Sequence, residues 1–169
     1  LLSVALLLFS FASFSQLNGN YTLNSAISSS GRNFQSFADF ISALNTNGVS
    51  DTVRLEVAVG SGPYNEQMVF TSYSGMSASN PIFIEGNNES ITYAPSSNDK
   101  RIVGFDGAAH ITLNNLKIQG LSIDYGYGIH FRGNSRHIII DSCTIDLSAI
   151  DSDDADNSAG IISSNSHTD

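Results

Sequence analysis

The chain has 169 residues, and its 16 acidic and 7 basic side chains give a formal net charge of −9. This balance argues against a nucleic-acid-binding protein, because binding a polyanion depends on Lys and Arg displacing counterions, and seven scattered bases form no basic stripe. A single cysteine, Cys143, excludes an internal disulfide framework, so the stability of the chain must come from packing.

Residues 1–15 form an apolar run without charge, "LLSVALLLFSFASFS", that ends in small residues. This pattern predicts a secretory signal peptide that is cleaved before Gln16. The run is too short for a transmembrane span, which needs about 20 apolar residues. Because an initiator Met and a positively charged start are missing, we expect the signal peptide to be truncated. The chain is therefore predicted to be secreted or held at the cell surface, with no membrane span after cleavage.

Residues 16–50 are predicted to form a leader and a short capping helix. In "SFADFISALNTNG" the apolar residues recur at helical spacing, Ser36 with Asp39 matches a helix start signal, and Asn47-Gly48 supplies the stop. We expect the helix to run from Ser36 to about Asn45 and to cover one end of the fold. Its inward face would hold Phe37, Phe40, Ile41 and Leu44.

Residues 51–169 are predicted to form short strands. Apolar and polar residues alternate from Val53 to Val59, and the short runs "QMVF", "PIFIEG" and "SITYA" follow. The linker Gly60-Ser61-Gly62-Pro63 separates the first two runs. Taken alone, it suits either a hairpin or a corner between two strands of a coil.

A repeat favours the corner. The segment from Ile102 matches the segment from Ile129 without a gap at a shift of 27 residues (129 − 102), and a third copy begins at Gly160. A period between about 20 and 50 residues with several short strands is typical of a solenoid. Equivalent strands that stack in register run parallel and need right-handed connections. The sequence therefore predicts an all-β fold, a right-handed parallel β-helix whose coils are truncated at the C-terminus.

The repeat also predicts two columns of side chains. His110 should stack on His137 at the strand spacing of about 4.8 Å, as a structural ladder rather than a metal site. Cys143 falls opposite Leu116 in an apolar column and is expected to be a small buried side chain.

The order of helix, alternating strand, "GPYNEQMVF" and a strand that ends in Gly resembles the opening of the pectin-lyase-like right-handed parallel β-helix superfamily. Gly62, Tyr64 and Glu66 match the Gly-x-Tyr-x-Glu corner of these proteins. The resemblance implies the fold, but it leaves the activity open because this scaffold supports many functions. The chain is also similar to β-helix regions of large exported surface proteins of Bacteroidota-type bacteria.

Within this superfamily, the opening is most similar to that of the pectin methylesterases. Tyr127 stands where the resemblance would place their catalytic Gln, and "TIDLSAIDSDD" after Cys143 lacks their Gln-Asp-Thr triplet. These differences disfavour an esterase. We expect Glu66 to satisfy backbone donors at its corner rather than to carry out chemistry.

Aromatic rings and a guanidinium group near Gly128 suit the recognition of sugar rings. If Ile129 and Phe131 face the core, the side chains next to them face outward. The alternative is that the tyrosines only line a corner. The ligand-binding residues that we predict are Tyr125, Tyr127, His130 and Arg132.

The segment "DSDDADN" crowds four carboxylates into a short stretch, and oxygen ligands at this density suit Ca²⁺. The candidate ligands are Asp151, Asp153 and Asp154. The segment lacks the Gly and Glu that complete an EF-hand loop, so a solvated acidic loop is the favoured alternative. We expect no cofactor, with Ca²⁺ as the open alternative.

Two classes of function remain. The favoured one is a non-catalytic extracellular β-helix module of a larger secreted or cell-surface protein, either a scaffold or a carbohydrate-binding adhesin. The alternative is the N-terminal portion of a polysaccharide-active enzyme, such as a lyase, a glycoside hydrolase or a pectin-esterase-like protein, whose catalytic coils lie downstream. The first is favoured because no paired acid and base is visible in the strands. The predicted partner is an extracellular polysaccharide, neutral rather than anionic because of the −9 charge.

Overall fold

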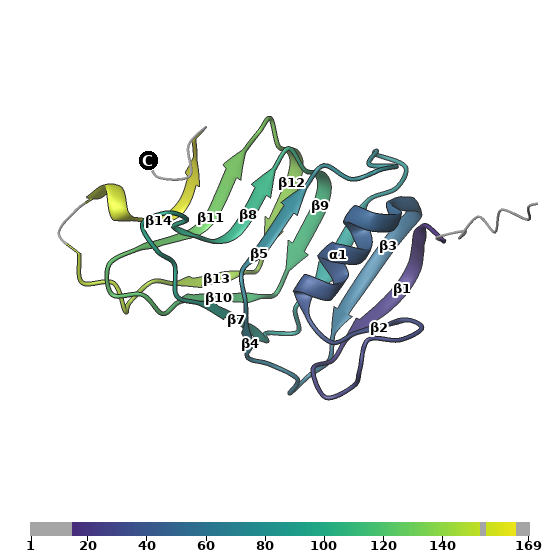
Figure 1. Ribbon diagram of the computed structural model, residues 1–169, viewed down its shortest axis with the longest axis horizontal. Coiled ribbons are helices and arrows are strands. Elements are labelled where there is room, and N and C mark those ends of the chain that lie inside the picture. The colour runs from purple at the N-terminus through teal and green to yellow at the C-terminus, as the bar shows by residue number, and fades with distance from the viewer. Residues whose placement is uncertain (1–14, 153–154, 165–169) are drawn as a thin grey trace, which may run out of the picture.

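The computed structural model describes residues 15–152 and 155–164 of the chain. Within these residues, the strands form three stacks, here named sheets A, B and C, and the chain winds through them coil after coil (Figure 1). Neighbouring strands within each sheet run parallel. This arrangement confirms the predicted all-β fold, a parallel β-helix with one short α-helix.

Each complete coil contributes one strand to each sheet. Sheet A contains β1 (Leu17–Leu23), β2 (Asn33–Phe34), β3 (Val49–Val57), β6 (Ile82–Glu85), β9 (Ala109–Asn114) and β12 (Arg136–Asp141). Sheet B contains β4 (Tyr64–Asn65), β7 (Ser90–Tyr93), β10 (Lys117–Gly120) and β13 (Thr144–Asp146). Sheet C contains β5 (Met68–Thr71), β8 (Arg101–Asp106), β11 (Gly126–Arg132) and β14 (Ser158–Ser163), with the 3₁₀ helix η1 (Ala155–Asn157) just before β14.

The repeat read from the sequence is confirmed as a register of stacked strands. Ile138 pairs with Ile111 in sheet A, and Ile145 pairs with Ile118 in sheet B. The column in sheet A continues into the preceding coil, where Ile82 pairs with Ile111. The third copy is also present, because β14 pairs with β11 in parallel.

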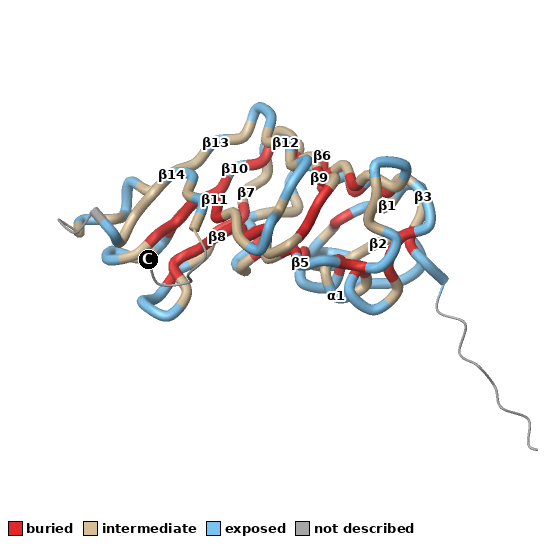
Figure 2. Tube along the Cα trace, turned by 90° about the horizontal axis from the view of Figure 1, so that it is seen from above, coloured by how far each residue is buried: buried red, intermediate tan, exposed pale blue. Residues whose placement is uncertain are grey.

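The interior is a continuous apolar core enclosed by the three sheets, with buried residues (red) along each of them (Figure 2). In sheet C, Phe70, Phe105 and Phe131 stack in a column with ring centroids 5.5 and 5.3 Å apart. Such a column follows directly from parallel pairing, since equivalent residues of successive coils lie one above the other.

The linker after β3 is a corner, and the hairpin alternative is wrong. The chain leaves sheet A at β3 and enters sheet B at β4, where Tyr64 pairs with Ile91 of the next coil. Gly60 has a φ of 77°, a left-handed conformation that favours glycine. The carboxylate of Glu89 accepts hydrogen bonds from the backbone N–H groups of Gly60 at 2.6 Å and Gly62 at 2.8 Å. The corner is therefore held by the coil that follows it.

The predicted helix is confirmed as α1 (Phe37–Asn47). The side chain of Ser36 caps its start by accepting a hydrogen bond from the N–H of Asp39 at 3.0 Å, and Gly48 with a φ of 68° ends it. Both figures of the backbone show α1 beside β5, at the end of sheet C (Figures 1 and 2). Of the four residues expected to face inward, Ile41 is only half-buried, whereas the other three are buried: Phe37, Phe40 and Leu44.

Strands β1 and β2 were not expected from the sequence. Strand β1 pairs in parallel with β3 and thus extends sheet A by one strand, and the two-residue β2 pairs with its end. The segment "LNGNYTL" gives little warning of this, because Gly and Asn are disfavoured in strands. Sheet A consequently presents a wider outer face than the repeat alone suggests.

Successive coils keep a constant length in sheet B but not in sheet C. Ile91, Ile118 and Ile145 follow one another at intervals of 27 residues. In contrast, 35 residues separate Met68 from Val103, its partner in sheet C. The extra residues lie in the loops 72–81 and 94–100, which leave and enter sheet C.

Two sequence predictions fall largely outside the described residues. All but the last residue of the predicted signal peptide 1–15 lies there, as do two of the predicted calcium ligands, Asp153 and Asp154. Within the described ranges, no helix combines the length and apolar character that crossing a membrane requires.

Candidate functional site

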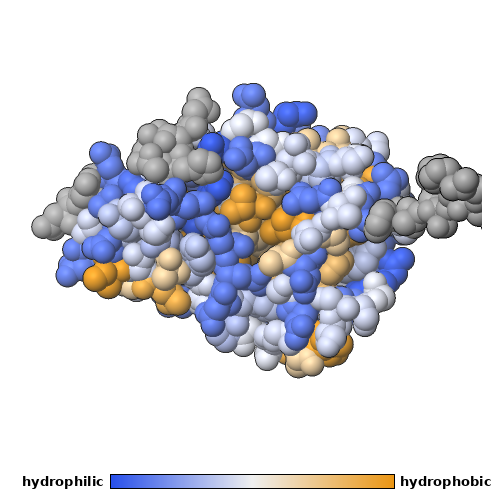
Figure 3. Space-filling view, in the orientation of Figure 1, coloured by the Kyte–Doolittle hydropathy of each residue, from blue (hydrophilic) through white to orange (hydrophobic). Residues whose placement is uncertain are grey.

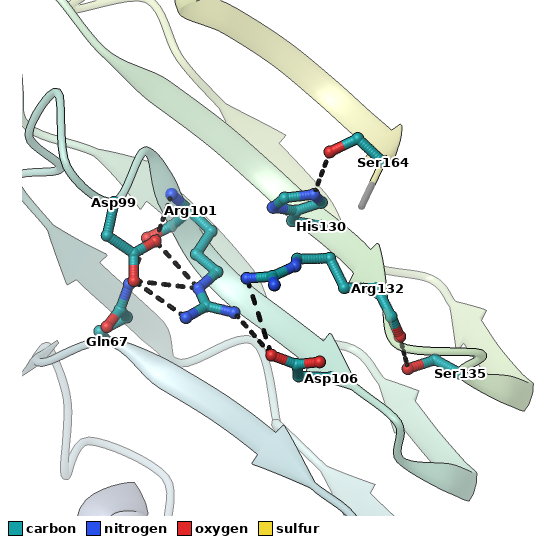
Figure 4. A network of polar contacts seen from close by, with 8 residues as sticks. All are labelled: Gln67, Asp99, Arg101, Asp106, His130, Arg132, Ser135 and Ser164. Carbon is teal, nitrogen blue, oxygen red and sulfur yellow. Dashed lines mark hydrogen bonds and ion pairs between the residues drawn. The ribbon is translucent and has the colours of Figure 1, made fainter. Parts of the chain in front are cut away.

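The predicted ligand-binding residues of β11 lie in a polar network on the outer face of sheet C (Figure 4). Ile129 is fully buried in the core and Phe131 packs against it, so His130 and Arg132 lie on the opposite face of the strand, as the alternation predicts. The side chains of Tyr127 and His130 are nevertheless only 1% exposed. The expectation of an open face is therefore wrong for these two residues, although their role in binding stays a prediction.

Neighbouring elements cause this burial. The hydroxyl of Tyr127 donates a hydrogen bond to the backbone carbonyl of Asp156 in η1 at 2.6 Å. Nε2 of His130 lies 2.9 Å from the hydroxyl of Ser164, just after β14. The next coil thus covers a face that alternation within β11 alone predicts to be open. Tyr125 is half-buried, and Nζ of Lys100 lies 5.8 Å from its ring centroid.

The charges of this network pair with one another. Arg101 forms a two-pronged contact with Asp99, with Nε 2.9 Å from Oδ1 and Nη2 3.0 Å from Oδ2. Asp106 lies between two guanidinium groups, 3.9 Å from Arg101 and 3.7 Å from Arg132. Only 9% of the Arg101 side chain is exposed. Bidentate Arg–carboxylate contacts fix geometry, so this network is suited to holding sheet C together.

The remaining predicted calcium ligand does not stand in a metal-binding cluster. Asp151 is exposed, and its backbone N–H donates to the carbonyl of Ile123 at 2.9 Å. Among the residues that the structure describes, no group of three or more metal-ligating side chains comes together.

A groove of about 550 Å³ on the outer face of sheet A is the better candidate site. The side chains that point outward from neighbouring strands lie side by side in two rows across this sheet. One row is Asn20, Arg54, Phe83, Thr112 and Ile139. The other row is Thr22, Glu56, Glu85, Asn114 and Asp141. Most of these residues line the groove, here called the sheet A groove.

One side of the groove is acidic and rich in amides. Asn114 donates a hydrogen bond from Nδ2 to Oε2 of Glu85 at 2.5 Å, and the backbone N–H of Asn87 donates to Oε1 of the same carboxylate at 3.1 Å. Nδ2 of Asn87 donates to Oε1 of Glu56 at 3.3 Å. The two glutamates are thereby oriented by amides, while Glu56 and Asp141 are exposed to solvent.

The other side of the groove is apolar and aromatic. The guanidinium of Arg54 lies over the ring of Phe83, 4.5 Å from its centroid. A further hollow of about 310 Å³ continues from Phe83 along the same face. It is lined by Pro81, Phe83, His110, Thr112, His137 and Ile139. Ile139 is 57% exposed, so an apolar platform of a ring and an aliphatic side chain faces solvent here.

The predicted histidine ladder borders this platform and is confirmed. The rings of His110 and His137 stack with centroids 4.6 Å apart and planes 11° from parallel. Burial lowers the pKa of His110 below its usual value of 6.5, and the neighbouring His137 and Arg136 lower it further. The pair therefore favours the neutral imidazole.

Glu66 has the structural role expected for it. Its carboxylate accepts hydrogen bonds from the N–H groups of Phe37 at 2.9 Å and Ala38 at 2.8 Å, the first turn of α1. Burial raises the pKa of Glu66, although these two donors oppose the rise. The matching Tyr64 is buried and donates to the carbonyl of Leu23 at 3.2 Å. This corner fixes the helix to the coils.

Cys143 lies in the predicted column but is half-buried rather than buried. Its pKa is raised by burial, which keeps the thiol protonated at neutral pH. It is half-buried because, within the described residues, no further strand of sheet B covers β13.

A third hollow, of about 350 Å³, lies where α1 meets β5, and a patch of hydrophobic side chains (orange) is visible there (Figure 3). Its lining includes Ile41 and Val69 but no charged residue. It therefore offers less to a polar ligand than the sheet A groove does.

Sequence reasoning missed the sheet A groove, although a signal for it exists. In four strands an apolar residue is followed by an acid or an amide at the same place, in "LE", "IE", "LN" and "ID". These pairs end at Glu56, Glu85, Asn114 and Asp141. The gapless repeat covers only the last two, because the shift between the earlier strands of sheet A is 29 residues.

The comparisons with known proteins do not identify a relative. No family model, no curated protein and no solved structure matches the chain.

Proposed function

We propose that the chain is a non-catalytic, extracellular β-helix module of a larger secreted or cell-surface protein, and that it binds a glycan in the sheet A groove. The observation that carries this proposal is the lining of the groove, which places an exposed aromatic and aliphatic platform beside a row of acid and amide side chains. The resemblance to the pectin-lyase-like superfamily supports the same view, because the name-giving members of that superfamily act on a polysaccharide.

The two sides of the groove match the two kinds of surface on a sugar ring. The C–H face of a pyranose packs on apolar and aromatic side chains, which Phe83 and Ile139 supply. The hydroxyl groups at its edge donate to carboxylates and amides, which Glu85 and Asn114 supply. The groove crosses the strands, so a glycan lying along the axis of the coils would contact one strand after another.

Replacing Phe83 tests the proposal. We expect Phe83→Ala to weaken the binding of the purified chain to oligosaccharides such as cellohexaose or N-acetylglucosamine hexamer at least about tenfold, because a stacked ring and its buried area are lost. Calorimetric titration measures the change. Ile123→Ala, which removes an exposed apolar side chain outside the groove, is the control and should leave the affinity unchanged.

Other outcomes would contradict the groove. Binding that survives Phe83→Ala but is lost in Arg132→Ala would place the ligand on the face of β11 instead. Binding to no oligosaccharide would leave a scaffold without a glycan site.

A polysaccharide-active enzyme is the second candidate, and one observation favours it. Glu56 and Glu85 are direct neighbours on β3 and β6, which places their backbones about 4.8 Å apart, near the roughly 5 Å that separates the two carboxyl groups of retaining glycosidases. If the chain is an enzyme, incubation with polysaccharides releases new reducing ends, and Glu85→Gln abolishes this activity. No product from any polysaccharide would exclude catalysis by this pair.

A further inference from the structure

The carboxylates of the sheet A groove lack basic partners. Glu56, Glu85 and Asp141 face the groove from β3, β6 and β12. Within residues 15–152 and 155–164, the ion pairs lie on sheet C, and none of them includes these three acids. Removing water from an unpaired carboxylate is costly, so a ligand that covers this row gains most if it brings positive charge.

The single arginine of the groove does not balance this charge. Arg54 stands next to Glu56 along β3, but its guanidinium lies 4.5 Å from the ring centroid of Phe83 and forms no ion pair in the described part of the chain. Three acids against one base leave the groove negative. The net charge of −9 on the whole chain adds to this field and attracts cations from a distance.

The acids are also placed at regular intervals. Glu56 and Glu85 occupy adjacent strands, Asn114 occupies the next, and Asp141 the one after it. Adjacent strands are about 4.8 Å apart, a distance comparable to the length of one sugar ring in an extended chain. The hydrogen bonds from Asn114 and Asn87 hold the Glu85 carboxylate in place before a ligand arrives. A regularly charged chain therefore fits the row better than a single cation.

We propose that the sheet A groove selects glycans with protonated amino groups, such as chains of deacetylated amino sugars, over neutral and anionic glycans. This inference rests on the proposed function, because it concerns the same groove. In this mode the sugar rings pack on Phe83, and ammonium groups pair with the acids in the opposite row. The uncharged acetylated chain keeps the packing and loses the ion pairs.

Three hexamers test the proposal by titration into the full chain at about pH 6, where ordinary carboxyl groups are ionised. They are glucosamine hexamer, its N-acetylated counterpart, and galacturonate hexamer. We expect the glucosamine hexamer to bind most tightly and to weaken as salt is added, with the acetylated hexamer weaker and insensitive to salt. The galacturonate hexamer should bind least.

Variants separate the groove from general charge attraction. The double variant Glu56→Gln, Glu85→Gln keeps the shape of the side chains and should lower the affinity for glucosamine hexamer about tenfold while leaving that for the acetylated hexamer unchanged. The charge-matched control Asp51→Asn, Asp124→Asn removes two exposed acids that do not line the groove. It should change neither affinity.

Each alternative result has a definite reading. If the acetylated hexamer binds as tightly as the glucosamine hexamer and Phe83→Ala weakens both, the charge selection is wrong but the glycan-binding function stands. If the control double variant weakens glucosamine binding as much as the groove variant does, the attraction is unspecific and the proposal fails. If no hexamer binds, the proposed function itself fails.

Discussion

The outer faces of sheets A and C lie on the same coils, yet they differ in how their charged side chains are used. On sheet C, Arg101 and Arg132 are largely buried and contact Asp99 and Asp106. On sheet A, the acids face a groove, and none of them forms an ion pair among the described residues. Parallel stacking places side chains in rows on both faces, so the difference arises from the residues that each row receives.

This difference indicates which face maintains the fold and which is available for recognition. Paired charges in a buried network are costly to disturb, because each partner depends on the other. Exposed charges that face water contribute little to stability. Mutations should therefore affect stability strongly on sheet C and weakly on sheet A.

The strongest expected contrast is between two arginines. Arg101→Ala leaves Asp99 and Asp106 without a partner on a largely buried face, so we expect the free energy of unfolding to fall by about 3 kcal/mol. Arg54→Ala loses only an exposed contact with a ring and should cost under about 1 kcal/mol. Chemical denaturation measures both, and equal losses would remove the distinction between the two faces.

Two glutamates extend the comparison to acids. Glu66 accepts two backbone hydrogen bonds at the start of α1, so Glu66→Ala should cost about 2 kcal/mol. Glu56 faces the groove and is exposed, and Glu56→Ala should change stability by less than about 0.5 kcal/mol. Glu66→Gln retains one acceptor oxygen and should recover part of the loss. A full loss in the Gln variant would show that the carboxylate charge, rather than hydrogen bonding, supports the helix.

A glycine tests whether the position of Arg101 matters. A Cβ at Gly104 would lie 2.8 Å from Cδ of Arg101, so Gly104→Ala should displace the guanidinium and cost about 1 kcal/mol. A Cβ at Gly160, also on sheet C, would meet no other atom within 4 Å, so Gly160→Ala is the matched control with no loss expected. Thermal unfolding of the two variants compares them directly. If Gly104→Ala is as stable as the control, the side chain of Arg101 adapts without cost.

The smallest expected effect concerns the histidine pair beside the groove. The pKa of His110 should lie below 6.5 in a nuclear magnetic resonance titration and should rise toward that value in His137→Gln. The folded chain then binds this proton less readily than the unfolded chain, so the stability that the pair contributes is present above about pH 6.5 and is lost as the pH falls. A His110 pKa that does not respond to His137→Gln would assign the shift to burial alone.

Much of the fold was predictable because it depends on patterns within short segments. The helix was visible from Ser36 and Gly48 at its two ends, and the coils were visible from the gapless match that starts at Ile102. Strand β1 was missed because its pairing with β3 outweighs its weak strand propensity. Local patterns cannot reveal such help from a distant neighbour.

The candidate site was less predictable, for a related reason. Alternation correctly placed His130 on the outer face of its strand, but it could not show that Ser164 and η1 would cover that face. The sheet A groove depends on which residues of distant strands become neighbours, as Glu56 and Glu85 do. Register across coils therefore has to be known before either face can be judged.

The unequal spacing of the coils bears on how such a chain changes over evolutionary time. Sheet C tolerates 35 residues between Met68 and Val103, whereas sheet B holds to intervals of 27. Insertions in the loops 72–81 and 94–100 would lengthen a coil without shifting the residues that stack in sheets A and B. These loops are accordingly the places where new sequence, including a peptide tag or a label for imaging, should be accommodated while the groove stays intact.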